Sequence, residues 1–335
     1  MRVLVAGGAG FVGSNLCRKL IRRGDAVDCL DNLSTGQPEQ VELLGKHRRF
    51  TFLDRDVADP AIVAELSGQA YDEIYHLACP TGVPNIATMG EEMMLASSSG
   101  TRNLLKLAVR SAARFLFASS AEAYGDPEMF PQAEAYFGNV DPVGARSPYE
   151  EGKRFGEALT AYYARRHGVD GRIVRIFNCY GPNMAASDQR VIPQMLNRMA
   201  AGEPVVIYGN GRQTRALIHV DDLLAGFDAV MAKGGRGGVY NIGGDREITI
   251  LELFELAATA AGSKRAPVFA DHFITDHGRR LPDTSKVRQL GWRQRISIER
   301  GLADAYRDVL AARARRAPRP AVKNENAVEA IYSRA

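Results

Sequence analysis

The fold is decided by the first thirteen residues, Met1–Gly13, which read MRVLVAGGAGFVG. The short apolar run Val3–Ala6 predicts a buried strand. Apolar residues at Val12, Leu16 and Leu20 recur every four positions and predict a helix directly after it. The glycines between the two suit a tight turn at the positive N-terminus of a helix, where a pyrophosphate group can bind. This order predicts a dinucleotide-binding unit.

The alternation of strand and helix continues along the first half of the chain. Further strand candidates are Ala26–Leu30, Phe50–Leu53, Glu73–Leu77, Phe115–Ser119 and Ile173–Phe177. Strands that alternate with helices form a parallel sheet covered on both faces. We therefore expect an α/β fold with a Rossmann-type, doubly wound parallel sheet.

The pattern changes after about residue 178, where glycine and proline become more frequent. Asp221 precedes one expected helix, and the spacing of Thr249 and Glu252 predicts a capping box at the start of another. We interpret this half as a smaller, interleaved α/β lobe for the substrate. The expected division is 1–178 for the dinucleotide-binding domain with a return at about 214–242, 179–213 and 243–314 for the lobe, and 315–335 for a mobile tail.

Composition limits the classes of function. The chain has 335 residues, a net charge of only +4 and no clustered basic face, so we expect no nucleic-acid partner. No stretch approaches the roughly 20 apolar residues that span a bilayer, so we expect no membrane partner. The four cysteines are scattered, which is typical of free thiols in a reducing compartment, and we expect a cytoplasmic protein without a metal site.

The glycine-rich loop and the acid after the second strand predict the cofactor. Gly7, Gly10 and Gly13 allow the backbone, with Phe11 and Val12, to approach a pyrophosphate closely. Asp31 ends the second expected strand, where a carboxylate accepts hydrogen bonds from the adenosine ribose and repels the extra phosphate of NADP. We therefore predict NAD. Asp56 and Val57 follow the third strand and form either an adenine contact or a solvated loop.

A tyrosine and a lysine supply the candidate chemistry. Tyr149 and Lys153 are four residues apart, so a helix places both on one face. A free phenol has a pKa near 10, and its anion must be stabilised by roughly 4 kcal/mol to act as a base near neutrality. A positive charge about 4 Å away contributes on that order. Ser120, just past the fifth strand, is placed to hydrogen-bond a sugar hydroxyl and the tyrosine.

With these residues the chain resembles the extended short-chain dehydrogenases that act on nucleotide sugars, over Met1 to about Leu310. Within that group it most resembles the UDP-glucuronate decarboxylases. The strings that carry the resemblance are DNLSTG (31–36), HLA (76–78), YEEGKR (149–154), RIFNCYGP (175–182), IYGNGRQTR (207–215) and RRLPD (279–283).

The resemblance implies roles that the residues alone do not assign. Besides Tyr149 and Lys153, the cofactor would contact Asn32, Ser34, Thr35, Gly36, Leu77 and Ala78. The UDP-sugar would contact Arg146, Asn178, Val191, Tyr208, Arg215 and Arg280, with Arg280 near the diphosphate or the sugar carboxylate. Glu122 matches an acidic residue near C5 of the sugar. Helices around Glu92–Val109 and Tyr149–Arg166 would pair across a two-fold axis in a homodimer.

The resemblance also implies a reaction. Tyr149 would remove the C4 hydroxyl proton while NAD takes the C4 hydride, and the resulting 4-keto sugar would lose its carboxylate as carbon dioxide and be reduced to UDP-xylose. The family usually has a hydroxyl where this chain has Ala121, and a cysteine where it has Pro148. Because of Ala121 we expect some UDP-4-keto-pentose to be released. The alternatives are a UDP-sugar 4-epimerase, a nucleotide-sugar 4,6-dehydratase, and a non-catalytic NAD-binding relative.

Overall fold

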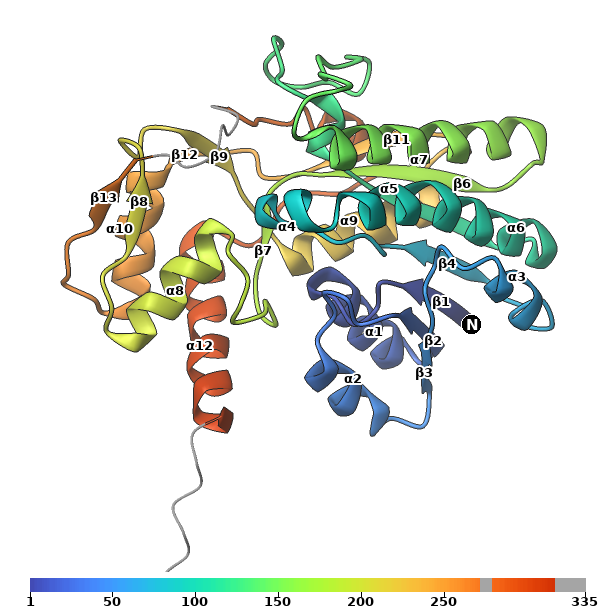
Figure 1. Ribbon diagram of the computed structural model, residues 1–335, viewed down its shortest axis with the longest axis horizontal. Coiled ribbons are helices and arrows are strands. Elements are labelled where there is room, and N and C mark those ends of the chain that lie inside the picture. Colours follow the sequence, from blue (N-terminus) through green and yellow to red (C-terminus); the bar gives the residue numbers. More distant parts are fainter. Residues whose placement is uncertain (272–278, 317–335) are drawn as a thin grey trace, which may run out of the picture.

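The computed structural model describes residues 1–271 and 279–316, so most of the expected tail lies outside the described residues. Its centre is a parallel sheet with strand order β11-β6-β5-β4-β1-β2-β3 (Figure 1). The strands are β1 (Arg2–Ala6), β2 (Ala26–Asp31), β3 (Phe50–Asp54), β4 (Glu73–His76), β5 (Arg114–Ser120), β6 (Gly171–Ile176) and β11 (Val239–Ile242). The predicted α/β fold is confirmed, and the ends of the six predicted strands agree to within two residues.

Both faces of the sheet are covered, as the apolar runs require. Along β1, Val3 and Val5 face one core, whereas Leu4 and Ala6 face another. The first core is closed by α1 (Phe11–Arg23), α2 (Pro38–Gly45) and α9 (Val220–Lys233). The second is closed by α3 (Ala61–Glu65), α6 (Thr101–Ser111) and α7 (Ser147–Arg166).

The segment between β4 and β5 is one broken helical run. It consists of α4 (Val83–Thr88), α5 (Gly90–Leu95), a π-helical turn η1 (Ala96–Gly100) and α6. Both α5 and η1 pack against α7. A 3₁₀ turn, η2 (Ala121–Tyr124), follows β5. These elements meet at the N-terminal end of α7, where the catalytic residues were predicted.

The second lobe lies on the left in Figure 1 and has its own core. Its helices are α8 (Val191–Ala201), α10 (Ile250–Ala261) and α12 (Ile298–Arg316), which meet through Leu196, Leu253 and Leu302. Its strands form the pairs β8–β13 (Val206–Tyr208, Val268–Ala270) and β9–β12 (Thr214–Ala216, Glu247–Thr249). The pair β7–β10 (Cys179–Tyr180, Ile218–His219) lies where the chain crosses between the lobes, and α11 (Ser285–Gln289) packs near β11.

Two expected helix starts have different outcomes. The Thr249 side chain accepts from the backbone N–H of Glu252 at 3.0 Å, so this half of the predicted capping box is confirmed, whereas the Glu252 carboxylate pairs with Arg246. The prediction that Asp221 precedes a helix is wrong, because α9 already begins at Val220. His219 caps α9 instead, since its Nδ1 accepts from the N–H of Asp221 at 3.2 Å and takes the place of the usual cap oxygen.

Candidate active site

The glycine-rich loop is compact enough that only glycine fits at two of its positions. Gly7 has φ +80°, and a Cβ added there would lie 2.5 Å from the backbone nitrogen of Ala78. A Cβ added at Gly13 would lie 2.0 Å from the carbonyl oxygen of Gly7. The loop therefore folds tightly between the end of β1, the end of β4 and the start of α1. Its backbone N–H groups at the start of α1 fit a pyrophosphate.

Asp31 lies beside this loop, at the carboxyl end of β2. Its carboxylate accepts from the N–H of Ala9 at 3.0 Å and from the N–H of Leu33 at 2.9 Å. Burial raises the pKa of Asp31, the two backbone hydrogen bonds oppose that shift, and the charge of Asp54 adds to it. An acceptor fixed in this way against the glycine loop fits the ribose of a dinucleotide.

The loops around Asp31 contain the other predicted cofactor residues. Asn32 donates through Nδ2 to Asp56 Oδ2 at 3.0 Å and accepts from the N–H of Ser34 at 3.1 Å. A Cβ added at Gly36 would lie 2.7 Å from Asp31 Oδ1, so this turn also packs on the carboxylate. The other residues predicted to contact the cofactor follow β1, β2 and β4. Thr35 is exposed, whereas Phe11, Val12, Leu77 and Ala78 are partly buried.

Val57 differs from the other predicted cofactor residues. Its side chain is buried in the second core and lies directly beneath Gly100 of η1. The backbone oxygen of Val57 also accepts from Nδ2 of Asn103 at 3.1 Å. A cofactor contact at this position would therefore come from the backbone N–H and not from the side chain.

The predicted catalytic residues lie at the end of β5 and the start of α7. Lys153 is buried, and its Nζ lies 5.6 Å from the ring centroid of Tyr149 and donates to the carbonyl of Ala118 at 3.0 Å. Ser120 ends β5 beside the Tyr149 phenol, and its hydroxyl lowers the pKa of that phenol. Sequence spacing on one helix therefore brought the phenol and the ammonium together, as predicted.

The pKa of Tyr149 is shifted in the direction opposite to the one that a base near neutral pH requires. Burial raises the pKa of its phenol well above the ordinary value, and the nearby Cys79 and Glu122 side chains raise it further. The hydrogen bond from Ser120 and the charge of Arg190 oppose the shift. Removal of the phenol from water thus outweighs the local stabilisation of its anion by the chain itself. The positive charge of a bound oxidised nicotinamide acts in the opposite direction.

Glu122 is held between two arginines. Its Oε2 pairs with Arg146 Nη2 at 2.6 Å and with Arg280 Nη2 at 3.0 Å. Arg146 also pairs with Glu150 at 3.1 Å, and Arg280 Nη1 donates to the carbonyl of Gly125 at 2.6 Å. The buried Arg146 Nη1 and Arg280 Nε have no hydrogen-bond partner among the described residues. Two such guanidinium donors around Glu122, which lies near Tyr149, fit an anionic part of a substrate.

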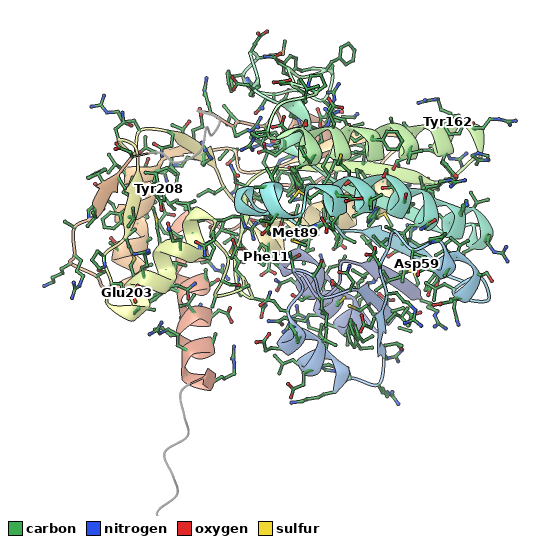
Figure 2. The ribbon with its side chains drawn as sticks, viewed as in Figure 1. Phe11, Asp59, Met89, Tyr162, Glu203 and Tyr208 are labelled. Carbon is green, nitrogen blue, oxygen red and sulfur yellow. The ribbon has the colours of Figure 1, made fainter. Side chains whose placement is uncertain are left out.

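The residues predicted to bind the nucleotide come from the crossover and the second lobe. Asn178 is exposed where the chain leaves β6, and Val191 is the first residue of α8. Tyr208 ends β8 on the second lobe (Figure 2), and its carbonyl accepts from Nε2 of Gln213 at 3.0 Å. Arg215 lies in β9, two residues after Gln213. The tight turn between β8 and β9 therefore places Tyr208 and Arg215 on one edge of this lobe.

Sequence reasoning missed Arg190. This residue stands at the N-cap position of α8 but makes no side-chain cap hydrogen bond. Its Nη2 pairs with Asp188 at 2.6 Å, and its guanidinium lies 5.5 Å from the ring centroid of Phe11. Figure 2 shows Phe11 at the centre of the molecule, between the sheet and the second lobe. Arg190 therefore brings a positive charge from the second lobe to the start of α1. The local signal for this residue is the Asp188–Arg190 pair before an apolar helix.

The sequence predicts no separate role for His76, which belongs to the string HLA (76–78). Burial and, to a smaller extent, the charge of Lys153 lower its pKa to about 3. Its Nε2 lies 3.1 Å from the carbonyl of Ala96, so this nitrogen is the donor of a neutral ring. His76 therefore supports η1 and does not compete with Tyr149 as a base at neutral pH.

The two departures from the family pattern are structurally accommodated. Ala121 is buried in an apolar cluster with Tyr124 and Phe177. Pro148 lies in the first turn of α7, where its missing N–H has no helical partner to lose. A serine at 121 would have to place a hydroxyl in or beside this apolar cluster.

The fold and the site together define an NAD-binding enzyme of the short-chain dehydrogenase type. The chain belongs to the NAD dependent epimerase/dehydratase family, whose family model matches residues 3–243. This agrees with the resemblance seen in the motifs, and NAD is the cofactor that the glycine loop and Asp31 fit.

The proteins that are similar to this chain in sequence include several UDP-glucuronic acid decarboxylases. The chain is 41% identical to UDP-glucuronic acid decarboxylase 1 of Arabidopsis thaliana over 303 residues, which cover 90% of this chain and 68% of the relative. It is 39% identical to UDP-glucuronic acid decarboxylase 1 of Xenopus tropicalis over 302 residues, covering 90% and 70%.

Solved structures of related enzymes share the whole fold. A UDP-glucose 4-epimerase from Thermotoga maritima, solved with UDP-glucose, has a TM-score of 0.86 and 29% identity and covers 93% of this chain and 99% of its own. A dTDP-glucose 4,6-dehydratase from Streptomyces venezuelae, solved with NAD bound, has a TM-score of 0.84 and 30% identity and covers 94% and 98%.

Proposed function

We propose that this protein decarboxylates UDP-glucuronate with bound NAD, through a 4-keto intermediate, to give UDP-xylose and some UDP-4-keto-pentose. The observation that carries the proposal is the cluster of Glu122, Arg146 and Arg280 beside Tyr149. It offers a carboxylate and unused arginine donors where a sugar with its own carboxylate would react. The relatives named as UDP-glucuronic acid decarboxylases support the same reaction.

Tyr149 acts as the base for the C4 hydroxyl. Ser120, which lies beside the Tyr149 phenol, would hydrogen-bond the C4 hydroxyl and align its proton for transfer. Lys153 supplies a buried positive charge near the phenol and would also bind the nicotinamide ribose. When bound, NAD would supply the acceptor for the C4 hydride, and its reduced form would supply the hydride for the final reduction.

A ketone at C4 makes the carboxylate at C6 part of a β-keto acid. Carbon dioxide can then leave while its bonding electrons enter an enolate at C4 and C5. Arg280 Nε and Arg146 Nη1, which have no hydrogen-bond partner among the described residues, can hold the carboxylate before this step. Glu122 or an ordered water then directs a proton to C5. The C4 ketone is thus the electron sink that the reaction needs, although the reaction has no net redox change.

The rival reactions share the first step and differ afterwards. A 4-epimerase must let the keto sugar rotate, and a 4,6-dehydratase uses an Asp–Glu pair where this chain has Ala121 and Glu122. Neither releases carbon dioxide. The cluster around Glu122 favours the decarboxylase because it adds two arginines to the site.

The test is a product analysis. Purified protein with NAD and UDP-glucuronate is expected to release carbon dioxide and to yield UDP-xylose together with a smaller amount of UDP-4-keto-pentose and a matching amount of NADH. Mass spectrometry of the products and NADH absorbance measure these outcomes. Intact UDP-glucuronate, or an isomer of the same mass, would rule out decarboxylation. UDP-xylose without ketone would remove only the leakage that we expect from Ala121.

We also propose that the protein is a homodimer in the cytoplasm. Large apolar side chains are exposed on neighbouring helices, namely Met94 and Leu95 on α5 and Phe155 and Tyr162 on α7. Such a surface is typical of a helix–helix interface between subunits. All four cysteines are free, which favours a reducing compartment. None of the helices in the described part of the chain has the length and apolar character that a bilayer crossing requires.

A further inference from the structure

The loop between η2 and α7 contains one fully buried glutamine, Gln132, whose exposed fraction is 0%. Its backbone N–H donates to the carbonyl of Leu281 at 2.8 Å, and its side-chain Oε1 accepts from the N–H of Leu281 at 3.0 Å. Its carbonyl accepts from the N–H of Asp283 at 2.9 Å. Gln132 therefore binds the backbone on both sides of Pro282, with which it forms a parallel bridge.

The segment that Gln132 binds begins directly after Arg280. Arg280 is itself buried, and its guanidinium bonds Glu122 and the carbonyl of Gly125. The position of this guanidinium thus depends on a backbone that runs outside the central sheet and is fixed one residue later by Gln132. The residues 272–278 before it are outside the described part of the chain.

Asn241, at the end of β11, ties this arrangement to the sheet. Its Nδ2 donates to the carbonyl of Gln132 at 2.9 Å and to the carbonyl of Asp283 at 3.1 Å. Its Oδ1 accepts from the hydroxyl of Tyr124 at 2.8 Å, and Tyr124 belongs to the same turn as Glu122. One buried network therefore connects both partners of the Glu122–Arg280 ion pair to the rigid edge of the sheet.

We propose that Gln132 is a positioning residue for decarboxylation, which holds Arg280 against Glu122 and has no part in the oxidation at C4. The inference rests on the proposed function and assigns Gln132 to one of its steps. Tyr149, Lys153 and Ser120 stand on α7 and β5 and make no hydrogen bond with Gln132 among the described residues. A change at Gln132 should therefore separate the two steps, whereas a general loss of structure would slow both.

The test compares Gln132→Met with the parent enzyme in single turnover. Methionine has a similar length but no strong acceptor for the N–H of Leu281. We expect NADH to appear at a rate within about twofold of the parent and carbon dioxide to appear about tenfold more slowly, a difference of about 1.4 kcal/mol in the barrier. Thr160→Val is the control, because it removes another fully buried hydrogen bond, to Gly156, in the middle of α7. This control variant should change neither the rate of NADH formation nor the rate of carbon dioxide release relative to the parent.

A double variant tests whether Gln132 acts through Arg280. If Gln132 acts through Arg280, adding Gln132→Met to Arg280→Lys should slow carbon dioxide release by much less than tenfold. Equal slowing of both steps in Gln132→Met, or a full additional loss in the double variant, would overturn the inference. If Gln132→Met does not fold, Gln132→Asn, which keeps the amide but shortens its reach, is measured in the same way. A parent enzyme that releases no carbon dioxide refutes the proposed function before any variant is compared.

Discussion

Burial raises the pKa of Tyr149 more than Ser120 and Arg190 lower it. A base must lose its proton, so a raised pKa reduces the active fraction at neutral pH, and that fraction grows as pH increases. Bound oxidised nicotinamide should shift this dependence to lower pH by favouring the phenolate.

We predict that C4 oxidation, followed as NADH formation in single turnover, rises with pH to a plateau below the pH at which a free phenol ionises. Tyr149→Phe should abolish this limb and lower the rate by about 10³-fold, within the usual range for loss of a general base. Tyr162→Phe is a matched control, since Tyr162 is half-exposed on the same helix. A Tyr149→Phe enzyme with an unchanged pH profile would assign the base to another group.

Single residues were predictable where the chemistry is local. Gly7 and Asp31 are marked by the first two strands, and Tyr149 and Lys153 by one helical turn. Arg190 and Gln132 could not be assigned in this way, since their partners Phe11 and Leu281 are more than a hundred residues away in the chain. No periodicity records a contact of that kind, and only the fold brings the two sides together.

At the scale of elements, the strands were predictable because apolar runs and glycine turns bound them, but the joints between elements were not. One joint centres on Asn183, which has φ +68°. Its N–H donates to Asp308 of α12 at 2.7 Å, its carbonyl accepts from Gln37 at 2.9 Å, and its Nδ2 donates to Asn15 of α1 at 2.9 Å. Asn183 thus connects the second lobe to two segments next to the cofactor loops.

We predict that this joint retains NAD. Asn183→Gly keeps the positive φ without strain and removes the side-chain bonds, so it should raise the rate of NAD release several-fold while lowering Tm by only a few degrees. Asn183→Ala should release NAD as fast and be less stable, because alanine resists the left-handed conformation by about 1 kcal/mol. Displacement of bound NADH, followed by fluorescence, measures release. An unchanged release rate in both variants would show that the joint is only structural.

At the scale of the whole molecule, the two lobes supply different parts of the predicted site. The sheet presents the dinucleotide loop and Tyr149 at its carboxyl edge, whereas α8 and the β8–β9 turn bring Arg190, Tyr208 and Arg215 from the other side (Figure 1). This arrangement agrees with the general rule that ligands bind at the carboxyl edge of open α/β sheets. The exposed apolar residues of α5 and α7 belong to the helical layer on one face of the sheet.

The last prediction concerns these exposed apolar residues. If α5 and α7 pair with a second copy, Phe155→Glu would bury a charge in the interface and should convert a dimer of about twice 36.5 kDa into a folded monomer. Phe269→Glu is the matched control, because Phe269 has the same exposed fraction, 53%, but lies on β13 of the other lobe. Light scattering gives the mass and circular dichroism the fold. Two variants of equal mass would refute pairing through α7, and a monomeric parent would refute the dimer altogether.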